Sequence, residues 1–460
     1  DRELLDNHEE DIIAHELFHH WFGDLVTCES WANLPLNESF ATYGEYIWRE
    51  EGFGRMEADM HLDNDLRSYL REAKSKQVDM IRFDYKDKED MFDSHSYAKG
   101  GRVLHMLRNY LGDDAFYNGF KKYLNDNAYQ SVEIHQLRIA MEAVCGEDLN
   151  WFFNQWFLAS GHPILVIDYN YDEKLKKQII DIEQIQDLST TPLYRLPFAI
   201  DIYVNGEVQR HLVDMTKKKQ QFIFSVSEKP INIIVDADHM LLAEIFDNKS
   251  DENWEEQMKA PLYMDSKIAL ENISNEKSAN AIIYAINNDF WGIRLLGIRK
   301  AKKLKDKSEL SDLIYSIAKK EKNTRVRSEA IRFLSDLENK NDYENLFESA
   351  TKEQSLLIAG SGLRSLAKVD SKKALDIAPD FEKDFKYLVG EIYGNYAGPE
   401  KADYFENRLE SANGYELYYL TRNYVTFLKN QELSSLLKGV RTIEKISKEA
   451  KSWMIRVTQY

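Results

Sequence analysis

Two histidines lie four residues apart near the start of the sequence, in the stretch His15-Glu16-Leu17-Phe18-His19. Apolar residues recur at helical spacing from Asp11 to Phe22 and a glycine follows, so we predict a helix over this stretch. Side chains four residues apart on a helix are neighbours, and two imidazoles on one face can reach one metal ion at about 2.0–2.1 Å. Glu16 follows His15 directly, which places its carboxylate beside the ion rather than among the ligands. The pattern predicts a metal site with a base that can take a proton from water.

A catalytic zinc site needs a third protein ligand and keeps a fourth position open. Glu38 follows His19 by 19 residues and falls in the first turn of the next predicted helix, near Pro35. A helix–loop–helix return would bring its carboxylate to the two histidines. The sequence therefore predicts one Zn2+ ion per chain, with His15, His19 and Glu38 as metal ligands and Glu16 as the catalytic base. A buried cluster of the same side chains without metal is the alternative.

Two further side chains close to the predicted ligands need an interpretation. Glu45 lies seven residues after Glu38 and faces the same way, so it is a candidate for holding a zinc histidine from outside the ligand set. A solvated helix carboxylate is the other interpretation of Glu45. His20 follows His19 directly and points off the metal face, so we predict a structural role for it.

Three segments of this sequence resemble the aminopeptidase N family of gluzincin zinc metallopeptidases. They are His15-Glu16-Leu17-Phe18-His19-His20-Trp21-Phe22-Gly23-Asp24, Leu36-Asn37-Glu38 and Ser96-Tyr97-Ala98-Lys99-Gly100. The resemblance implies zinc-dependent removal of N-terminal residues from peptide substrates. It also implies that Tyr97 is catalytic, because its phenol would donate a hydrogen bond to the oxygen that becomes negatively charged during attack on the peptide carbonyl.

Three positions depart from the pattern of that family. Asp24 replaces the usual asparagine, Pro35 stands where a tryptophan is common, and Ser39 replaces a glycine. All three flank the ligands, so they affect the detail of the pocket and leave the metal site intact. Asp24 is retained with Glu45 as a candidate residue in the shell around the ligands.

The start of the sequence carries an expectation of its own. In the resembled family a Gly-x-Met-Glu-Asn motif, whose glutamate grips the free amino group of the substrate, precedes the zinc helix, and this sequence begins at Asp1 without it. The resemblance therefore implies the C-terminal portion of a longer peptidase that lacks the N-terminal β-domain. We expect the missing N-terminal domains of the same protein to complete the full-length form, and the chain alone to have low activity.

The whole chain is predicted to be multidomain α+β. Residues 1–162 are expected to form the helical part of a thermolysin-like, gluzincin catalytic domain, and residues 163–247, with alternating apolar residues, a small antiparallel β-sandwich. Residues 248–460 are helical again, with three similar segments around positions 298, 331 and 363. Their regular spacing favours a HEAT-like α-solenoid over an ordinary helical bundle.

Composition narrows the partners. With 78 acidic and 60 basic residues the net charge is −18, which argues against nucleic acid, and no apolar run is long enough for a membrane-spanning segment. The two cysteines are too few for a disulfide framework.

Two other functions stay open beside the peptidase: a zinc hydrolase of epoxide-hydrolase type, and an inactive scaffold that binds partners through its solenoid. The complete set of ligands, base and tyrosine favours an enzyme.

Overall fold

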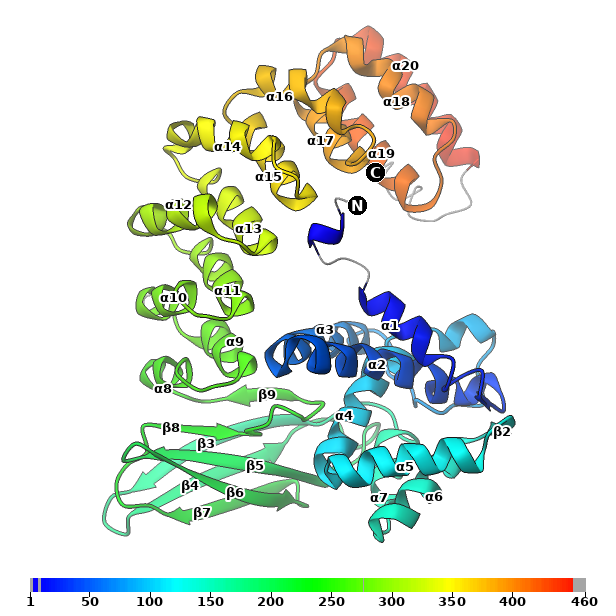
Figure 1. Ribbon diagram of the computed structural model, residues 1–460, viewed down its shortest axis with the longest axis vertical. Helices are drawn as coiled ribbons and strands as arrows, with labels where there is room; N and C mark the ends of the chain where they lie inside the picture. The colour runs from blue at the N-terminus through cyan, green and yellow to red at the C-terminus, as the bar shows by residue number, and fades with distance from the viewer. Residues whose placement is uncertain (1–2, 7–9, 276, 450–460) are drawn as a thin grey trace. The chain divides into compact units, whose positions relative to one another are not determined.

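The computed structural model describes residues 3–6, 10–275 and 277–449 (Figure 1). The chain divides into two compact units, one made of residues 9–297 and one made of residues 298–460 with the first eight residues. No helix among the described residues is long and apolar enough to cross a membrane.

The first unit begins with a helical part in which α2 and α3 lie side by side (Figure 1). Its helices are α1 (Glu10–Phe18), α2 (Pro35–Phe53), α3 (Arg55–Ala73), α4 (Gly100–Leu111), α5 (Asp113–Asp126), α6 (Ile134–Cys145) and α7 (Asn150–Trp156). A short parallel pair, β1 (Val26–Cys28) and β2 (Gln130–Val132), joins two of its loops. The rings of Phe22, Phe40, Phe120 and Tyr123 pack together in the core of this part.

Helix α1 ends four residues earlier than the sequence predicts. It ends at Phe18, because the backbone N–H of Trp21 donates to the carbonyl of Phe18 at 3.0 Å and tightens the last turn. The predicted C-cap glycine, Gly23, has a φ of 150° and donates to the carbonyl of Val26 at 2.9 Å. The first predicted ligand therefore lies inside the helix and the second lies just beyond its end.

A β-sandwich of two sheets follows. One sheet has the order β7-β4-β3-β9 and the other the order β6-β5-β8. The strands are β3 (Ile164–Asp172), β4 (Lys177–Gln184), β5 (Leu196–Val204), β6 (Glu207–Met215), β7 (Lys219–Ser225), β8 (Asn232–Val235) and β9 (Glu244–Asp247). A two-residue turn joins β5 to β6, with φ values of 53° at Asn205 and 76° at Gly206.

The sandwich is not purely antiparallel, and that part of the prediction is wrong. Strand β9 pairs in parallel with β3, with Ile164 opposite Glu244 and Ile167 opposite Asp247. The strand before β9 is β8, which belongs to the other sheet. The chain therefore crosses between the sheets before β9 pairs with β3. A crossover connection of this kind permits parallel pairing, whereas a tight hairpin does not.

After β9, the residues that the structure describes are mainly helical. The helices are α8 (Asp251–Gln257), α9 (Tyr263–Asn272), α10 (Ser278–Ile286), α11 (Trp291–Ala301), α12 (Ser311–Lys320), α13 (Thr324–Leu334), α14 (Glu344–Thr351), α15 (Leu356–Ala367), α16 (Ser371–Ile377), α17 (Lys386–Tyr396), α18 (Ala402–Leu409), α19 (Gly414–Lys429) and α20 (Leu433–Glu449). In the second unit α12 packs on α13 and α14 on α15, while α13, α15, α17 and α19 contact one another in series. Asp6 caps α15 by accepting hydrogen bonds from Ser355 Oγ and the backbone N–H of Leu357.

Candidate active site

The three predicted ligands meet in the helical part of the first unit. Their ligand atoms all lie within 4.8 Å of one another. Glu38 Oε2, in the first turn of α2, is 3.2 Å from His15 Nε2 and 3.3 Å from His19 Nε2. One carboxylate oxygen is thus approached by the same ring nitrogen of both histidines.

The other ring nitrogen of each histidine, Nδ1, faces an acceptor. His15 Nδ1 lies 2.8 Å from Glu45 Oε1, and His19 Nδ1 donates to the carbonyl of Phe22 at 3.1 Å. In a neutral imidazole these acceptors place the proton on Nδ1 and leave the lone pair on Nε2. Both lone pairs then face Glu38, which is the arrangement that a metal ligand set requires.

The carboxylates of Glu38 and Glu45 in this cluster are stabilised by positive charge. Burial disfavours the charged form of His15, but hydrogen bonds to Glu38 and Glu45 outweigh burial and raise the pKa of His15 to about 9. Against its own burial, hydrogen bonds to the two histidines lower the pKa of Glu38 to about 2. Protons on the histidines or a metal cation can supply the positive charge.

These distances fit zinc. Two ligands bound to a tetrahedral ion at about 2.0–2.1 Å are about 3.3–3.4 Å apart, and the separations of 3.2 and 3.3 Å in this structure are close to that value. Two imidazole nitrogens with one carboxylate oxygen form a recognised donor set for catalytic zinc. The residues present therefore fit the metal that the sequence predicts.

Tyr97 lies at the same site. Its ring stacks on that of His15, with centroids 5.9 Å apart and planes 10° from parallel. Burial and then the nearby Glu38 raise the pKa of Tyr97, with a smaller contribution from Glu16, so the phenol keeps its proton near neutral pH. Glu16 itself is exposed on α1. A carboxylate and a protonated phenol thus accompany the predicted ligands.

A π-helical turn (η4, His95–Lys99), immediately before α4, positions Tyr97. Ser39 Oγ, next to Glu38 on α2, donates to the carbonyl of Ser96 at 2.7 Å. A Cβ added at Gly100 would lie 1.8 Å from the same Ser39 Oγ. The close approach of these two elements ties the predicted metal ligand to the predicted catalytic tyrosine.

The other sequence candidates have different surroundings. Glu45 contacts His15, as described above, whereas the carboxylate of Asp24 lies 3.4 Å from His20 Nδ1. Both members of the second pair are mostly exposed, at 73% for the Asp24 side chain and 67% for His20. The position of Asp24 therefore does not support a contact with a metal ligand. Asp24 instead forms a solvated surface pair with His20.

Comparison with known proteins identifies this part of the chain. Residues 4–156 match the peptidase family M1 domain. The matched segment makes up the first third of the chain and is referred to below as the M1 domain. The pattern of histidines, glutamates and tyrosine described above lies entirely within it.

Relatives of the M1 domain include named aminopeptidases. Probable aminopeptidase 1 of Sulfurisphaera tokodaii is 31% identical over 228 residues, which are 48% of this chain and 28% of that protein. Tricorn protease-interacting factor F2 of Thermoplasma acidophilum is 37% identical over 161 residues, which are 34% of this chain and 20% of that protein. The matched part thus spans less than a third of either relative.

A solved structure resembles almost the whole chain. Aminopeptidase A of Legionella pneumophila, crystallised in complex with aspartic acid, has a TM-score of 0.68 at 17% sequence identity. The match covers 97% of this chain and 64% of that one. The two chains therefore share a fold that extends well beyond the M1 domain.

A second group of possible metal ligands in the M1 domain has a different character. Ligand atoms of Glu72, Asp93 and His95 also lie within 4.8 Å of one another. However, Lys76 Nζ and Arg82 Nη2 lie 2.5 and 2.7 Å from Asp93 Oδ2. Although burial opposes ionisation of Asp93, these cations hold its pKa below the usual range. Because its charge is already balanced, this group is a poor site for a further cation.

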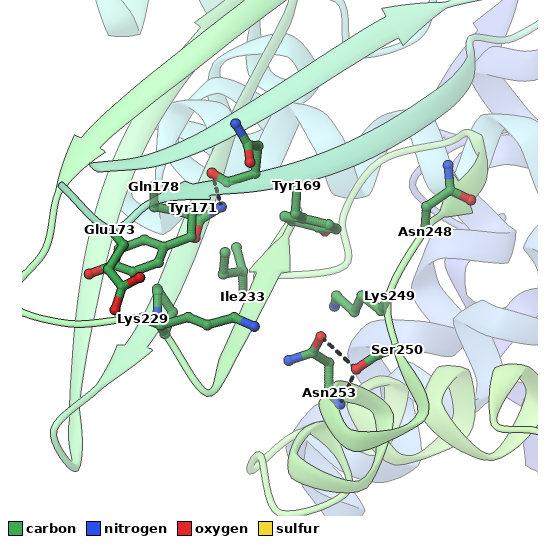
Figure 2. A pocket seen from close by; sticks show the side chains of 12 residues that line it. Tyr169, Tyr171, Glu173, Gln178, Lys229, Ile233, Asn248, Lys249, Ser250 and Asn253 are labelled. Atoms are coloured by element: carbon green, nitrogen blue, oxygen red, sulfur yellow. Dashed lines mark hydrogen bonds between the residues drawn. The ribbon is translucent and has the colours of Figure 1, made fainter. Parts of the chain in front are cut away.

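A polar depression of about 590 Å3 lies outside the M1 domain, at one end of the β-sandwich (Figure 2). Figure 2 shows Tyr169 and Ile233 beside it, with Lys229 and Lys249 reaching toward it from different segments. The Lys249 ammonium is already paired with Asp247 at 3.1 Å and donates to Gln257 at 2.6 Å. None of the lining residues belongs to the histidine cluster, so this depression is separate from the candidate active site.

One contributor to the site could not be identified from the sequence. His61, on α3, lies 3.1 Å from the second oxygen of Glu45. The local signal is the spacing of the buried residues Ala58, Leu62 and Tyr69 after Gly54. That spacing is compatible with a helix, but it does not show which of the polar residues turns toward the histidines.

Proposed function

We propose that this chain belongs to a zinc-dependent aminopeptidase, a hydrolase that removes N-terminal residues from peptides. One observation carries the proposal: the Nε2 atoms of His15 and His19 converge on Glu38 inside an M1 domain. The named aminopeptidases among the relatives support the reaction class. Family M1 peptidases generally use zinc, and we propose one ion per chain, held by the group of His15, His19 and Glu38.

We assign the roles as follows. A zinc ion held by His15, His19 and Glu38 would supply Lewis-acid polarisation of the scissile carbonyl and of the attacking water. Glu16 accepts a proton from that water and delivers it to the leaving nitrogen, so that the C–N bond breaks with the amine as product. Tyr97 keeps its proton and donates a hydrogen bond to the carbonyl oxygen as negative charge develops there. Glu45 orients His15 through Nδ1.

The proposal includes the arrangement of the chain. We propose a catalytic helical part over residues 1–162, a sandwich over 163–247 and a HEAT-like solenoid over 248–460. The serial packing of alternate helices in the second unit supports the solenoid.

Further domains of a longer protein are part of the proposal. Several apolar side chains of α1 and the following turn are at least half exposed: Ile12, Ile13, Leu17 and Trp21. Contiguous apolar surface of this kind usually marks an interface. We propose that additional domains of the same protein cover it and help to form the substrate pocket.

The test uses the full-length protein and leucine and alanine arylamides, with N-acetylated arylamides as matched controls. We expect turnover of the free amines alone, loss of turnover on treatment with a zinc chelator, and recovery when zinc is restored. Equal turnover of acetylated substrates would contradict the exopeptidase assignment. Hydrolysis of an epoxide without peptide turnover would favour the epoxide-hydrolase alternative.

A further inference from the structure

Each carboxylate oxygen of Glu45 lies close to an imidazole nitrogen, and only one of the two imidazoles belongs to a proposed zinc ligand. Oε1 lies 2.8 Å from His15 Nδ1, and Oε2 lies 3.1 Å from His61 Nε2. His61 comes from α3, a helix that contributes no proposed ligand. The side chains of Glu45 and His61 are only 16% and 13% exposed, so water has little access to either group. A carboxylate bridged between two imidazoles in this way has little freedom to rotate.

A second carboxylate lies on the far side of His61. Asp11 Oδ2 is 3.6 Å from His61 Nδ1, which is within ion-pair range but too long for a hydrogen bond, and Arg49 donates to both oxygens of Asp11 at 2.6 and 2.7 Å. Each ring nitrogen of His61 therefore lies near a carboxylate. Burial lowers the pKa of His61, but Glu45, Asp65 and Asp11 outweigh it and raise the pKa.

Acidic and basic side chains alternate along this series, in the order Glu45, His61, Asp11 and Arg49, and Glu57 lies 3.8 Å from Arg49. A carboxylate thus lies against His15 Nδ1 with its second oxygen beside His61. An ionised acceptor makes a stronger hydrogen bond to the Nδ1–H of His15 than a neutral one does. It also increases the basicity of the opposite ring nitrogen, which is the nitrogen that faces the metal position.

We propose that His61 is a positioning residue of the zinc site, which acts by fixing Glu45 against His15. This inference rests on the zinc site of the proposed function and deepens it. Its consequence is specific: the effect of His61 on metal affinity passes through Glu45. Removal of an outer partner of a metal-bound histidine typically costs about 10–100-fold in affinity. Because His61 stands one contact further out than Glu45, we expect a loss of about 10-fold for His61 and a larger loss for Glu45.

The experiment measures zinc affinity by competition with a chromophoric chelator, so it does not depend on turnover. His61→Phe removes the contact to Glu45 and is expected to weaken zinc binding about 10-fold. His61→Gln keeps an N–H at the same reach and should restore most of the affinity. His20→Phe, which changes the exposed histidine beside His19, is the matched control and should bind zinc as the unmodified protein does.

A double-mutant cycle tests the route of the effect. In a Glu45→Ala background, His61→Phe should cause no further loss of zinc affinity, because the intermediary is already absent. Thermal unfolding of the metal-free variants, followed in parallel, measures any change in folding. Unchanged affinity in His61→Phe, or a loss that adds in full to that of Glu45→Ala, overturns the proposal. An unmodified protein that binds no zinc would instead overturn the proposed function on which this inference rests.

Discussion

Two groups of histidine and carboxylate side chains in the M1 domain each have their possible ligand atoms within 4.8 Å of one another. The side chains that surround the two groups are different. In the first group, Glu38 faces two imidazoles whose far nitrogens are held by Glu45 and by a backbone carbonyl. In the second, Asp93 is paired with Lys76 and Arg82, and His95 Nδ1 lies 3.7 Å from Glu72, too far for a hydrogen bond. The proximity of three donors is common to both. The charge already present beside the carboxylate separates them.

The two groups also do different work for the same tyrosine. Asp93 Oδ1 accepts from the backbone N–H groups of His95 and Ser96 at 3.0 and 3.1 Å, and so fixes the start of the π-helical turn. The first group contacts the side chain of that turn, because Tyr97 stacks on His15. One group therefore holds the backbone that presents Tyr97, and the other receives its ring.

The largest expected effect tests which group binds metal. Glu38→Ala should abolish zinc binding under conditions that saturate the unmodified protein, because a ligand is lost and the loss exceeds the roughly 10–100-fold typical of an outer partner. Glu72→Ala, the matched change in the second group, should leave one zinc per chain. Elemental analysis of both purified variants decides between the groups. Retention of zinc in Glu38→Ala together with its loss in Glu72→Ala would reverse the assignment.

The next effect separates metal binding from catalysis within the first group. Removal of one oxyanion donor typically lowers turnover by about 10²–10³-fold, so Tyr97→Phe should lower kcat by that order. Loss of a general base costs about 10²–10⁴-fold, which is the range expected for Glu16→Gln. Both variants of the full-length protein should keep their zinc. An unchanged kcat for Tyr97→Phe would show that the stacked tyrosine is structural.

A smaller effect should appear in the second group as a dependence of stability on pH. Burial, and then Lys99 and Arg82 against the opposing charge of Asp93, hold the pKa of His95 well below its usual range. The unfolded chain therefore binds a proton that the folded chain does not, and stability is lost as the pH falls below about 6.5. The slope from this one group is at most about 1.4 kcal/mol per pH unit.

His95→Phe should flatten that part of the curve. Free energies of unfolding in urea at pH 7, 6 and 5, with chelator present, provide the measurement. His135→Phe, a change at an exposed histidine on α6, is the control and should keep the slope of the unmodified protein. An equal slope in His95→Phe and in the unmodified protein would mean that another group causes the loss.

The smallest expected effect concerns Asp24, which the sequence suggested as a neighbour of the ligands. Exposed ion pairs contribute little, so Asp24→Asn should change the free energy of unfolding by less than about 0.5 kcal/mol. Zinc affinity should also be unchanged. The two measurements described above for the other variants apply here too. A loss of zinc affinity in Asp24→Asn would show that Asp24 contributes to the metal site of the first group.

Local geometry explains what could be predicted from the sequence. The spacing of His15 and His19 is a property of one helix, and the start of the next helix at Pro35 was visible from the residue itself. By contrast, α3 carries Asp59 and Asp63 on its buried face, at 6% and 1% exposure. Two acids among the apolar residues obscure the hydrophobic pattern that marks a buried helix.

Tertiary partners explain the rest. Asp63 is tolerated in the core because Lys267, from α9, pairs with it at 2.9 Å. The same kind of distant pairing places His61 beside Glu45 and strand β9 beside β3. Neither neighbour is close in sequence, so spacing rules that apply within one element could not identify them.

The close approach of Ser39 to Gly100 limits which sequence variants of this protein can fold. Every codon change that replaces Gly100 by another amino acid introduces a Cβ at a point 1.8 Å from the Ser39 hydroxyl oxygen. Even the change to alanine would therefore push apart the helix that carries Glu38 and the turn that carries Tyr97. A population that carries this gene should show almost no variation at codon 100, while the neighbouring exposed positions of the same protein drift.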